Sequence, residues 1–261
     1  LLQLGLTSLL AVRLSSVLNQ QHGVSTSAVG LLQHRTAEAM VEYMGGAEEE
    51  AALIVRRDRV ANGRALRLPL SDEQQQMCGL YEMGGESGAY NVPIVERMRG
   101  KIDVEKLQAA VRGAAGRHEA LRMRYGSDEN GAAYQCPVAV EEWELPTREV
   151  WAGSEQEAAA EVDEEVTRAI KIEVSSVRLL VVHVGKDEHV VAINVHHIAT
   201  DGWSGALVME DVAAAYSALV DGRAVELAAE PAVRYADYAA WQHEMLGDAA
   251  RLEPHLEYWR G

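Results

Sequence analysis

Two apolar segments separated by a short charged stretch constrain the fold of this chain more than any other feature. Residues 177–185 read VRLLVVHVG and residues 189–197 read HVVAINVHH, with a KDE stretch at positions 186–188. Two runs of branched aliphatic residues joined by a short polar turn predict a β-hairpin. We therefore expect the second run to form a buried strand that ends in two adjacent histidines.

Helical patterns and a second strand pair accompany this hairpin. One helix is expected after Asp103, with apolar positions Val104, Leu107, Val111 and Ala114. Three more are expected: after Ser154, which can form a capping box with Glu157, to about Ile170; after Ser204 to about Leu219; and from Tyr235 to Leu246. Residues 121–126 and 132–138 alternate as strands around a polar turn. Helices mixed with hairpin-linked strands favour a mixed α/β (α+β) fold over a doubly wound parallel sheet.

The first 44 residues differ in character from the rest of the chain. Helices are expected over residues 7–22 and 27–33, and Thr36 can cap a third that continues through Met44. Residues 45–65 open with a glycine pair and carry charge blocks of both signs, which is typical of a linker. We expect a partial helical domain at 1–44, a linker at 45–65 and a second domain at 66–261.

Composition excludes several classes of function. The net charge of −16, from 24 basic and 40 acidic residues, repels phosphate backbones, so we expect no nucleic-acid partner. No apolar run reaches the ~18 residues of a membrane span, so no membrane partner is expected. Cys78 and Cys136 have no zinc spacing, which favours a metal-free protein in a reducing, cytoplasmic setting. The chain does not begin with Met, and we expect it to belong to a longer protein.

The two histidines that close the apolar run are the leading candidates for chemistry. Side chains alternate along a strand, so His196 and His197 should point in opposite directions, and only one can face a given cleft. Asp201 follows in a loop, and Gly202 permits a positive φ and a close approach of ligand to backbone. Imidazole titrates near neutral pH and can act as a general base. The alternative is a pair of structural histidines beside an Asx turn.

Several quoted motifs, taken in order, resemble one family. HHIATDGWS at 196–204 resembles the core motif of condensation domains of nonribosomal peptide synthetases, in the chloramphenicol-acetyltransferase-like superfamily. Three further stretches resemble other motifs of that family in the expected order: PLSDEQQQM at 69–77, RHEALRMRY at 117–125 and YADYAAWQ at 235–242. The resemblance covers residues 66–261. It implies an N-terminal lobe with a mixed sheet flanked by helices.

The resemblance also implies a role for each site residue. His197 would face the substrate channel and hydrogen-bond the acceptor amine, as a base or as a positioning group, while His196 would be structural. Asp201 would form a structural ion pair with an arginine of the second motif, with Arg117 as first choice and Arg122 as second. The backbone N–H of Gly202 could stabilise a tetrahedral oxyanion.

Ser8 lies in LGLTSLLAVRL, at the expected start of a helix. Taken alone, it is an ordinary helix N-cap. Upstream of a condensation-like domain, residues 1–44 resemble the C-terminal part of a carrier domain, and Ser8 would then carry 4'-phosphopantetheine. A helix N-terminus suits the attached phosphodiester, because free N–H groups and the helix dipole favour negative charge.

The resemblance therefore implies part of a modular nonribosomal peptide synthetase, with a hybrid polyketide line left open. The reaction would join a carrier-bound acyl or peptidyl thioester to a carrier-bound aminoacyl amine. The implied partners are carrier domains, a C-terminal lobe and an adenylation domain. Two alternatives stay open: an ester-forming O-acyltransferase of the same superfamily, and a catalytically silent carrier-docking module. We expect the isolated piece to be inactive.

Overall fold

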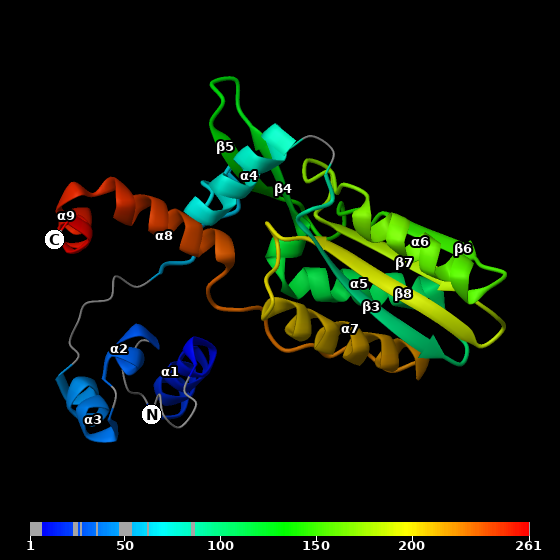
Figure 1. The fold of residues 1–261 in the computed structure, drawn as a ribbon, viewed down its shortest axis with the longest axis horizontal. Helices are drawn as coiled ribbons and strands as arrows, with labels where there is room; N and C mark the ends of the chain where they lie inside the picture. The colour runs from blue at the N-terminus through cyan, green and yellow to red at the C-terminus, as the bar shows by residue number, and fades with distance from the viewer. Residues whose placement is uncertain are drawn as a thin grey trace. The chain divides into compact units, whose positions relative to one another are not determined.

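The computed structural model describes residues 7–22, 26, 28–34, 36–46, 54–61, 63–84 and 87–260. Contacts divide the chain into two compact units, residues 1–53 and 54–261. Each unit is described by itself below, with the labels of Figure 1. No helix in the described ranges is both long and apolar enough to cross a membrane.

The described residues of the first unit form three helices, as the sequence predicts. They are α1 (Ser8–His22), α2 (Ala28–Gln33) and α3 (Ala37–Gly46). The hydroxyl of Thr36 accepts a hydrogen bond from the N–H of Ala39 at 3.1 Å, which confirms the predicted cap of α3. The side chains of Ala11, Leu31 and Met40 are buried and supply a small apolar centre.

A four-stranded mixed sheet organises the second unit (Figure 1). Its order is β3 (Asn91–Arg99), β8 (Glu188–His196), β7 (Val177–His183) and β6 (Thr147–Trp151). β8 runs antiparallel to both β3 and β7, which confirms the predicted hairpin, whereas β6 runs parallel to β7. The sequence analysis did not predict β6, because this strand has only five residues, opens with three polar ones and has no fully buried position.

Helices cover both faces of this sheet, as the mixed α/β prediction requires. α5 (Val104–Arg117) and α7 (Ser204–Val220) pack on one face, and α6 (Glu155–Thr167) packs on the other (Figure 1). The side chains of β7 and β8 point alternately to the two faces of the sheet, and each face has its own hydrophobic core. Val177, Leu179, Val181, Val191, Ile193 and Val195 join the α5–α7 core, and Leu180, Val182, Val190 and Ala192 join the α6 core. Each Val, Leu or Ile side chain among them stabilises the fold by roughly 1.5–3 kcal/mol when fully buried.

The remaining elements surround the end of the sheet at which β8 finishes or extend from it. They are β1 (Val60–Ala61), β2 (Arg64–Ala65), α4 (Asp72–Gly84), the 3-10 helix η2 (Glu119–Arg122), β4 (Met123–Ser127), β5 (Ala133–Pro137), α8 (Tyr235–Gly247) and α9 (Ala249–Arg260). β4 and β5 pair as the predicted hairpin. Its turn contains Gly131 with φ 81°, a left-handed conformation that favours glycine.

Two of the predicted helix starts are confirmed by their hydrogen bonds. Asp103 accepts from the N–H of Lys106 at 3.0 Å, and Ser154 accepts from the N–H of Glu157 at 3.2 Å. In a capping box the carboxylate of Glu157 would accept from the N–H of Ser154. Here it accepts from the N–H of the preceding residue, Gly153. α6 ends at Thr167 and not at Ile170 as predicted, because Ile170 turns into the core on the opposite face of the sheet.

A network of four buried charges joins residues 54–61 to the rest of the second unit. Arg59 lies 2.8 Å from Glu119 and 2.9 Å from Asp237, and Arg234 lies 2.6 Å from Glu119. These side chains are at most 13% exposed, so the ion-pair partners replace water in stabilising each charge. The later part of the predicted linker is therefore packed on the unit that follows it.

Candidate active site

The two adjacent histidines at the end of β8, His196 and His197, lie in different surroundings. His196 is the last residue of the strand and is 1% exposed, whereas His197 is exposed to solvent and lines a cavity. The opposite directions follow from strand alternation, as expected. The imidazole of His197 is therefore the one that a substrate can reach.

A hydrogen bond fixes which nitrogen of His197 can accept a proton. Its Nδ1 lies 2.8 Å from the backbone oxygen of Thr200. A carbonyl oxygen can only accept, so Nδ1 must carry the hydrogen and Nε2 of the neutral ring presents a lone pair. The backbone N–H of His197 donates to the oxygen of Tyr90 at 2.8 Å, which holds the residue in place at the strand end.

The cavity beside His197 has a volume of about 340 Å³, within the range of small-molecule sites. It is lined by Glu73, Gln74, Met77, Ala120, His197, Ile198, Ala199, Thr200, Asp201, Ser204 and Tyr235. Among these described residues are two carboxylates and neither a lysine nor an arginine. The electrostatic environment therefore favours a neutral or cationic group next to the imidazole.

A buried polar network supports the loop that follows the histidines. Nε2 of Gln74 and the hydroxyl of Tyr125 each approach the backbone oxygen of Ile198 at 3.3 Å, and Gln135 donates to Gln74 at 3.2 Å. All four residues are buried. Gln74 was not singled out from the sequence, although it lies within the quoted stretch 69–77. Only the packing of α4 against this loop reveals its supporting role.

Asp201 acts as the cap of α7. Its Oδ1 accepts from the N–H of Trp203 at 3.1 Å and from the N–H of Ser204 at 2.7 Å. Partial burial raises the pKa of Asp201, but hydrogen bonds from Ser204 and Trp203 outweigh it, so the pKa lies below its ordinary value. The prediction that Ser204 caps this helix is wrong, because Ser204 is already its first helical residue.

The predicted ion pair between Asp201 and Arg117 is also wrong. Arg117 lies 2.6 Å from Asp211, and Nε2 of His118 lies 2.7 Å from the same carboxylate oxygen. The second choice, Arg122, donates instead to the backbone oxygens of Ala115 and Val138. The physical reason is the packing of α5 against α7, which brings Asp211 on α7 to the end of α5. Arg117 therefore links the end of α5 to α7 through Asp211.

Gly202 lies beside the cavity without lining it. A Cβ at this position would meet no atom within 4 Å, and the residue is not among the glycines with positive φ. The backbone therefore does not require glycine here for its own conformation. The positive φ that the sequence allowed is therefore not used, and the open space beside Gly202 leaves room for a ligand to approach.

His196 has the features of a structural histidine. Its Nδ1 accepts from the N–H of Ile198 at 3.1 Å, and its ring packs near the rings of Tyr81 and Tyr90, with centroids 6.0 and 6.2 Å away. Burial, with a smaller contribution from the charge of His197, lowers the pKa of His196 to about 4. The ring is therefore neutral at physiological pH.

Ser8 is the first residue of α1. The hydroxyl of Thr7 accepts from the N–H of Leu10 at 3.2 Å, so Thr7 makes the hydrogen bond that an N-cap makes. The side chain of Ser8 lies outside the described part of the structure. A serine at the first turn of a 15-residue helix fits the attachment of a phosphodiester, because that end of the helix favours negative charge. In the described residues no group of three or more metal-ligating side chains comes together.

Comparison with known proteins gives the family. Residues 65–261 match the family model described as condensation domain, and residues 1–44 match the one described as phosphopantetheine attachment site. Because the first match spans well over half of the chain, this chain belongs to the condensation-domain family. The second match agrees with the expected phosphopantetheine cofactor.

Relatives with both parts are modular synthetases. One of the linear gramicidin synthase proteins of Brevibacillus parabrevis is 32% identical over 264 residues, which cover 99% of this chain and 3% of that protein. A dimodular nonribosomal peptide synthase of Bacillus subtilis (strain 168) is 31% identical over 271 residues, covering 99% of this chain and 11% of that protein. The chain thus spans a small part of the length of these relatives.

Solved structures share the fold of the second unit. The X-domain from teicoplanin biosynthesis has a TM-score of 0.69 and 27% identity, covering 80% of this chain and 44% of that chain. The first condensation domain of the calcium-dependent antibiotic synthetase, in complex with a substrate analogue, has a TM-score of 0.62 and 26% identity, covering 75% and 48%. These likenesses confirm the predicted chloramphenicol-acetyltransferase-like fold.

Proposed function

We propose that this chain serves amide-bond formation in a modular nonribosomal peptide synthetase. One observation carries the proposal: the exposed imidazole of His197 is fixed at Nδ1 and lines a cavity without cationic side chains among its described residues. The similarity of this chain to peptide synthetases supports the choice of two substrates, a thioester donor and an amine acceptor, each presented by a carrier domain. Orientation of two tethered reactants then supplies much of the rate enhancement.

In this reaction His197 first accepts a proton and then returns it. The acceptor nitrogen attacks the thioester carbonyl, a C–N bond forms and the C–S bond breaks. The proton of the nitrogen passes to Nε2 of His197, and the imidazolium returns it to the departing thiolate. The backbone N–H of Gly202, which follows the cavity-lining Asp201, is our candidate for stabilising the oxyanion. His196 and Asp201 act through packing and through the start of α7.

Ser8 is our proposed attachment residue for phosphopantetheine, which supplies the thiol that holds an acyl group when it is bound. Intact-protein mass after incubation with coenzyme A and a phosphopantetheinyl transferase tests this. The expected result is a mass gain that Ser8→Ala abolishes. A gain that persists in Ser8→Ala would refute the assignment.

The test of the catalytic proposal uses the synthetase that contains this chain. His197→Ala should lower the yield of carrier-bound amide, measured by mass spectrometry, by ~10²–10⁴-fold, the range for loss of a general acid–base group. The matched control is His243→Ala, which removes an exposed histidine of α8 outside the cavity. Unchanged turnover in His197→Ala would favour the carrier-docking alternative. Product from an alcohol acceptor, and none from an amine, would favour the ester-forming alternative.

A further inference from the structure

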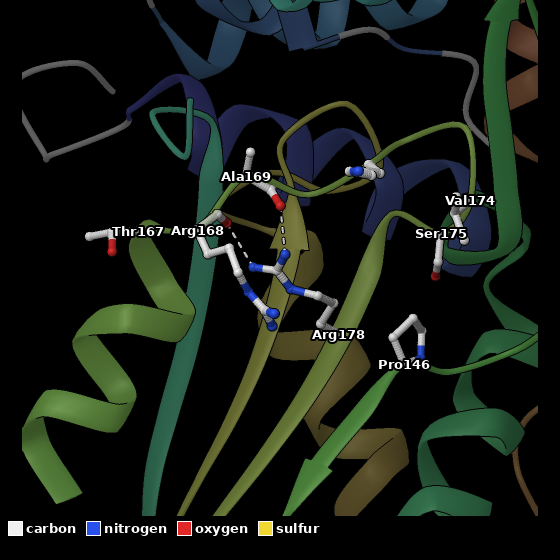
Figure 2. A pocket seen from close by; sticks show the side chains of 8 residues that line it. Pro146, Thr167, Arg168, Ala169, Val174, Ser175 and Arg178 are labelled. Atoms are coloured by element: carbon white, nitrogen blue, oxygen red, sulfur yellow. Dashed lines mark hydrogen bonds between the residues drawn. The ribbon is translucent and has the colours of Figure 1, made fainter. Parts of the chain in front are cut away.

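Two cavities of the second unit differ in how their charged side chains are paired. Figure 2 shows the larger one, of about 440 Å³, beside the end of α6. There Arg178 donates to the backbone oxygen of Ala169 at 2.6 Å and lies 2.6 Å from Glu165. The protein itself therefore satisfies this guanidinium. The cavity of His197, of about 340 Å³, contains a carboxylate, that of Glu73, for which the opposite holds.

The carboxylate of Glu73 has no hydrogen-bond or ion-pair partner among the residues that the structure describes. Glu73 is the second residue of α4 and is exposed, so water solvates its charge and a ligand in the cavity can reach it without breaking a protein contact. The other carboxylate of the lining, Asp201, already accepts from the N–H groups of Trp203 and Ser204. Glu73 therefore supplies the negative charge that is left for a ligand.

The start of α4 is fixed against α8, and the position of Glu73 is fixed with it. The N–H of Asp72 donates to Oε1 of Gln242 at 2.8 Å. The hydroxyls of Ser71 and Tyr235 lie 2.9 Å apart, and Ser71 is fully buried. These contacts join the first turn of α4 to the helix that contributes Tyr235 to the cavity wall. The backbone that carries Glu73 is thus in place before a substrate arrives.

Aromatic rings lie beside this carboxylate. Tyr235 lines the cavity, and the centroid of its ring is 5.5 Å from that of Tyr238. Burial raises the pKa of Tyr235, against a hydrogen bond with Ser71, and the negative charge of Glu73 raises that pKa further. Burial and the charge of Glu73 likewise raise the pKa of Tyr238. Both phenols are therefore neutral at physiological pH and lie within the field of Glu73. A neutral aromatic ring next to a carboxylate attracts cations.

We propose that Glu73 makes the cavity of His197 selective for a substrate with a positively charged side chain, an alkylammonium or guanidinium group. That group would pair with the carboxylate of Glu73 and lie against the ring of Tyr235. Among the described lining residues there is no lysine or arginine to repel it. The inference rests on the proposed function, because it names the substrate class of the same site. The charged side chain belongs to the acceptor or to the donor, and the experiment separates the two.

Competition between substrates in the synthetase that contains this chain is the first measurement. Acceptor carriers loaded with lysine or with norleucine, which lacks the ammonium group, compete for one neutral donor, and mass spectrometry gives the ratio of the two amides. A second arm varies the donor in the same way. We expect a preference for lysine of about threefold or more in one arm, from an exposed ion pair and a cation–π contact. A smaller preference in both arms would overturn the proposal.

Two neighbouring carboxylates of α4 provide the variant and its matched control. Glu73→Gln should lower the preference for lysine about threefold or more. Asp72→Asn removes another exposed charge of the same helical turn, outside the cavity lining, and should lower the preference less than twofold. Thermal melting confirms that both variants are folded. Equal losses in the two variants would overturn the role of Glu73, because any negative charge at the start of α4 would then suffice.

Binding separates this inference from the proposed function, because it requires no turnover. Calorimetry compares the amides that lysine and norleucine form with aminopantetheine, the amine analogue of pantetheine, as ligands of the same synthetase. We expect the lysine compound to bind about threefold or more tightly, and this difference to be lost in Glu73→Gln. Equal affinities would overturn the inference even if amides form. An intact difference in affinity without amide formation from any acceptor would overturn the proposed function instead.

Discussion

Nδ1 of His197 lies 2.8 Å from the backbone oxygen of Thr200, and this contact orients the imidazole toward its cavity with Nε2 available. A base needs that nitrogen to exchange a proton, whereas a positioning group needs it only to hydrogen-bond. We therefore expect His197→Gln, which keeps a polar group without a titrating one, to lose ~10²-fold or more of the amide-forming rate. Single-turnover rates measured from mildly acidic to mildly alkaline pH check this. A rate close to that of wild type, with an unchanged pH profile, would show that His197 only positions the acceptor.

Asp201 should contribute to stability as a helix cap and not as a buried ion. Asp201→Ala should lower the free energy of unfolding by ~1 kcal/mol, and Asp201→Asn should cost much less because Asn also caps well. The pKa of Asp201 is lowered on folding, so its contribution is present above the unfolded pKa and is lost as pH falls through the folded pKa. Urea unfolding at neutral pH and at acidic pH measures both effects. A loss of several kcal/mol at neutral pH in Asp201→Asn would contradict the cap.

Arg117 and Asp211 should be energetically coupled, and Arg117 and Asp201 should not. The first pair lies 2.6 Å apart with side chains 22% and 14% exposed. Asp211→Ala should destabilise the fold by roughly 2 kcal/mol, since it removes charged hydrogen bonds and leaves a half-buried guanidinium. Double-mutant cycles with Arg117→Ala should give a coupling above ~0.5 kcal/mol for Asp211 and near zero for Asp201. A larger coupling energy for Asp201 than for Asp211 would support the Arg117–Asp201 ion pair that the resemblance implied.

His196 should make the fold sensitive to mild acid. Its pKa falls from 6.5 to about 4 on folding, so the folded state binds fewer protons between these values. Its stability contribution is complete above the unfolded pKa and declines as pH falls toward the folded one, by about 3 kcal/mol in total. His196→Asn keeps an acceptor for the N–H of Ile198 and should flatten this decline. Chemical unfolding in steps from neutral pH down to the folded pKa provides the comparison, and parallel curves for the two proteins would exclude His196 as the cause.

Residues 54–65 should stabilise the second unit. A chain that starts at residue 66 loses Arg59 and leaves Glu119 and Asp237 without one of their buried partners. We expect it to be less stable than a chain that starts at residue 54 by about 3 kcal/mol or more, because an unpaired buried charge is strongly destabilising. Arg59→Met in the longer chain should reproduce most of the loss. Equal melting temperatures for the two lengths would show that this segment is only a linker.

The sequence by itself determined the elements whose signals are local. The apolar runs that became β7 and β8, the cap residues Asp103 and Ser154 and the alternation that separates His196 from His197 all act over a few neighbouring residues. These features depend on interactions within short stretches of chain, so the sequence is enough to predict them. The ordered motifs likewise identified the family.

Tertiary structure alone decided which charges meet and which residues share a cavity. Asp211 displaced Asp201 as the partner of Arg117 because α5 packs on α7, and Arg59 found Glu119 across 60 positions of sequence. β6 joins the sheet, although it has only five residues, because it pairs in parallel with the edge of β7. Such pairings depend on how distant segments pack against one another, and the pattern of neighbouring residues does not predict that packing.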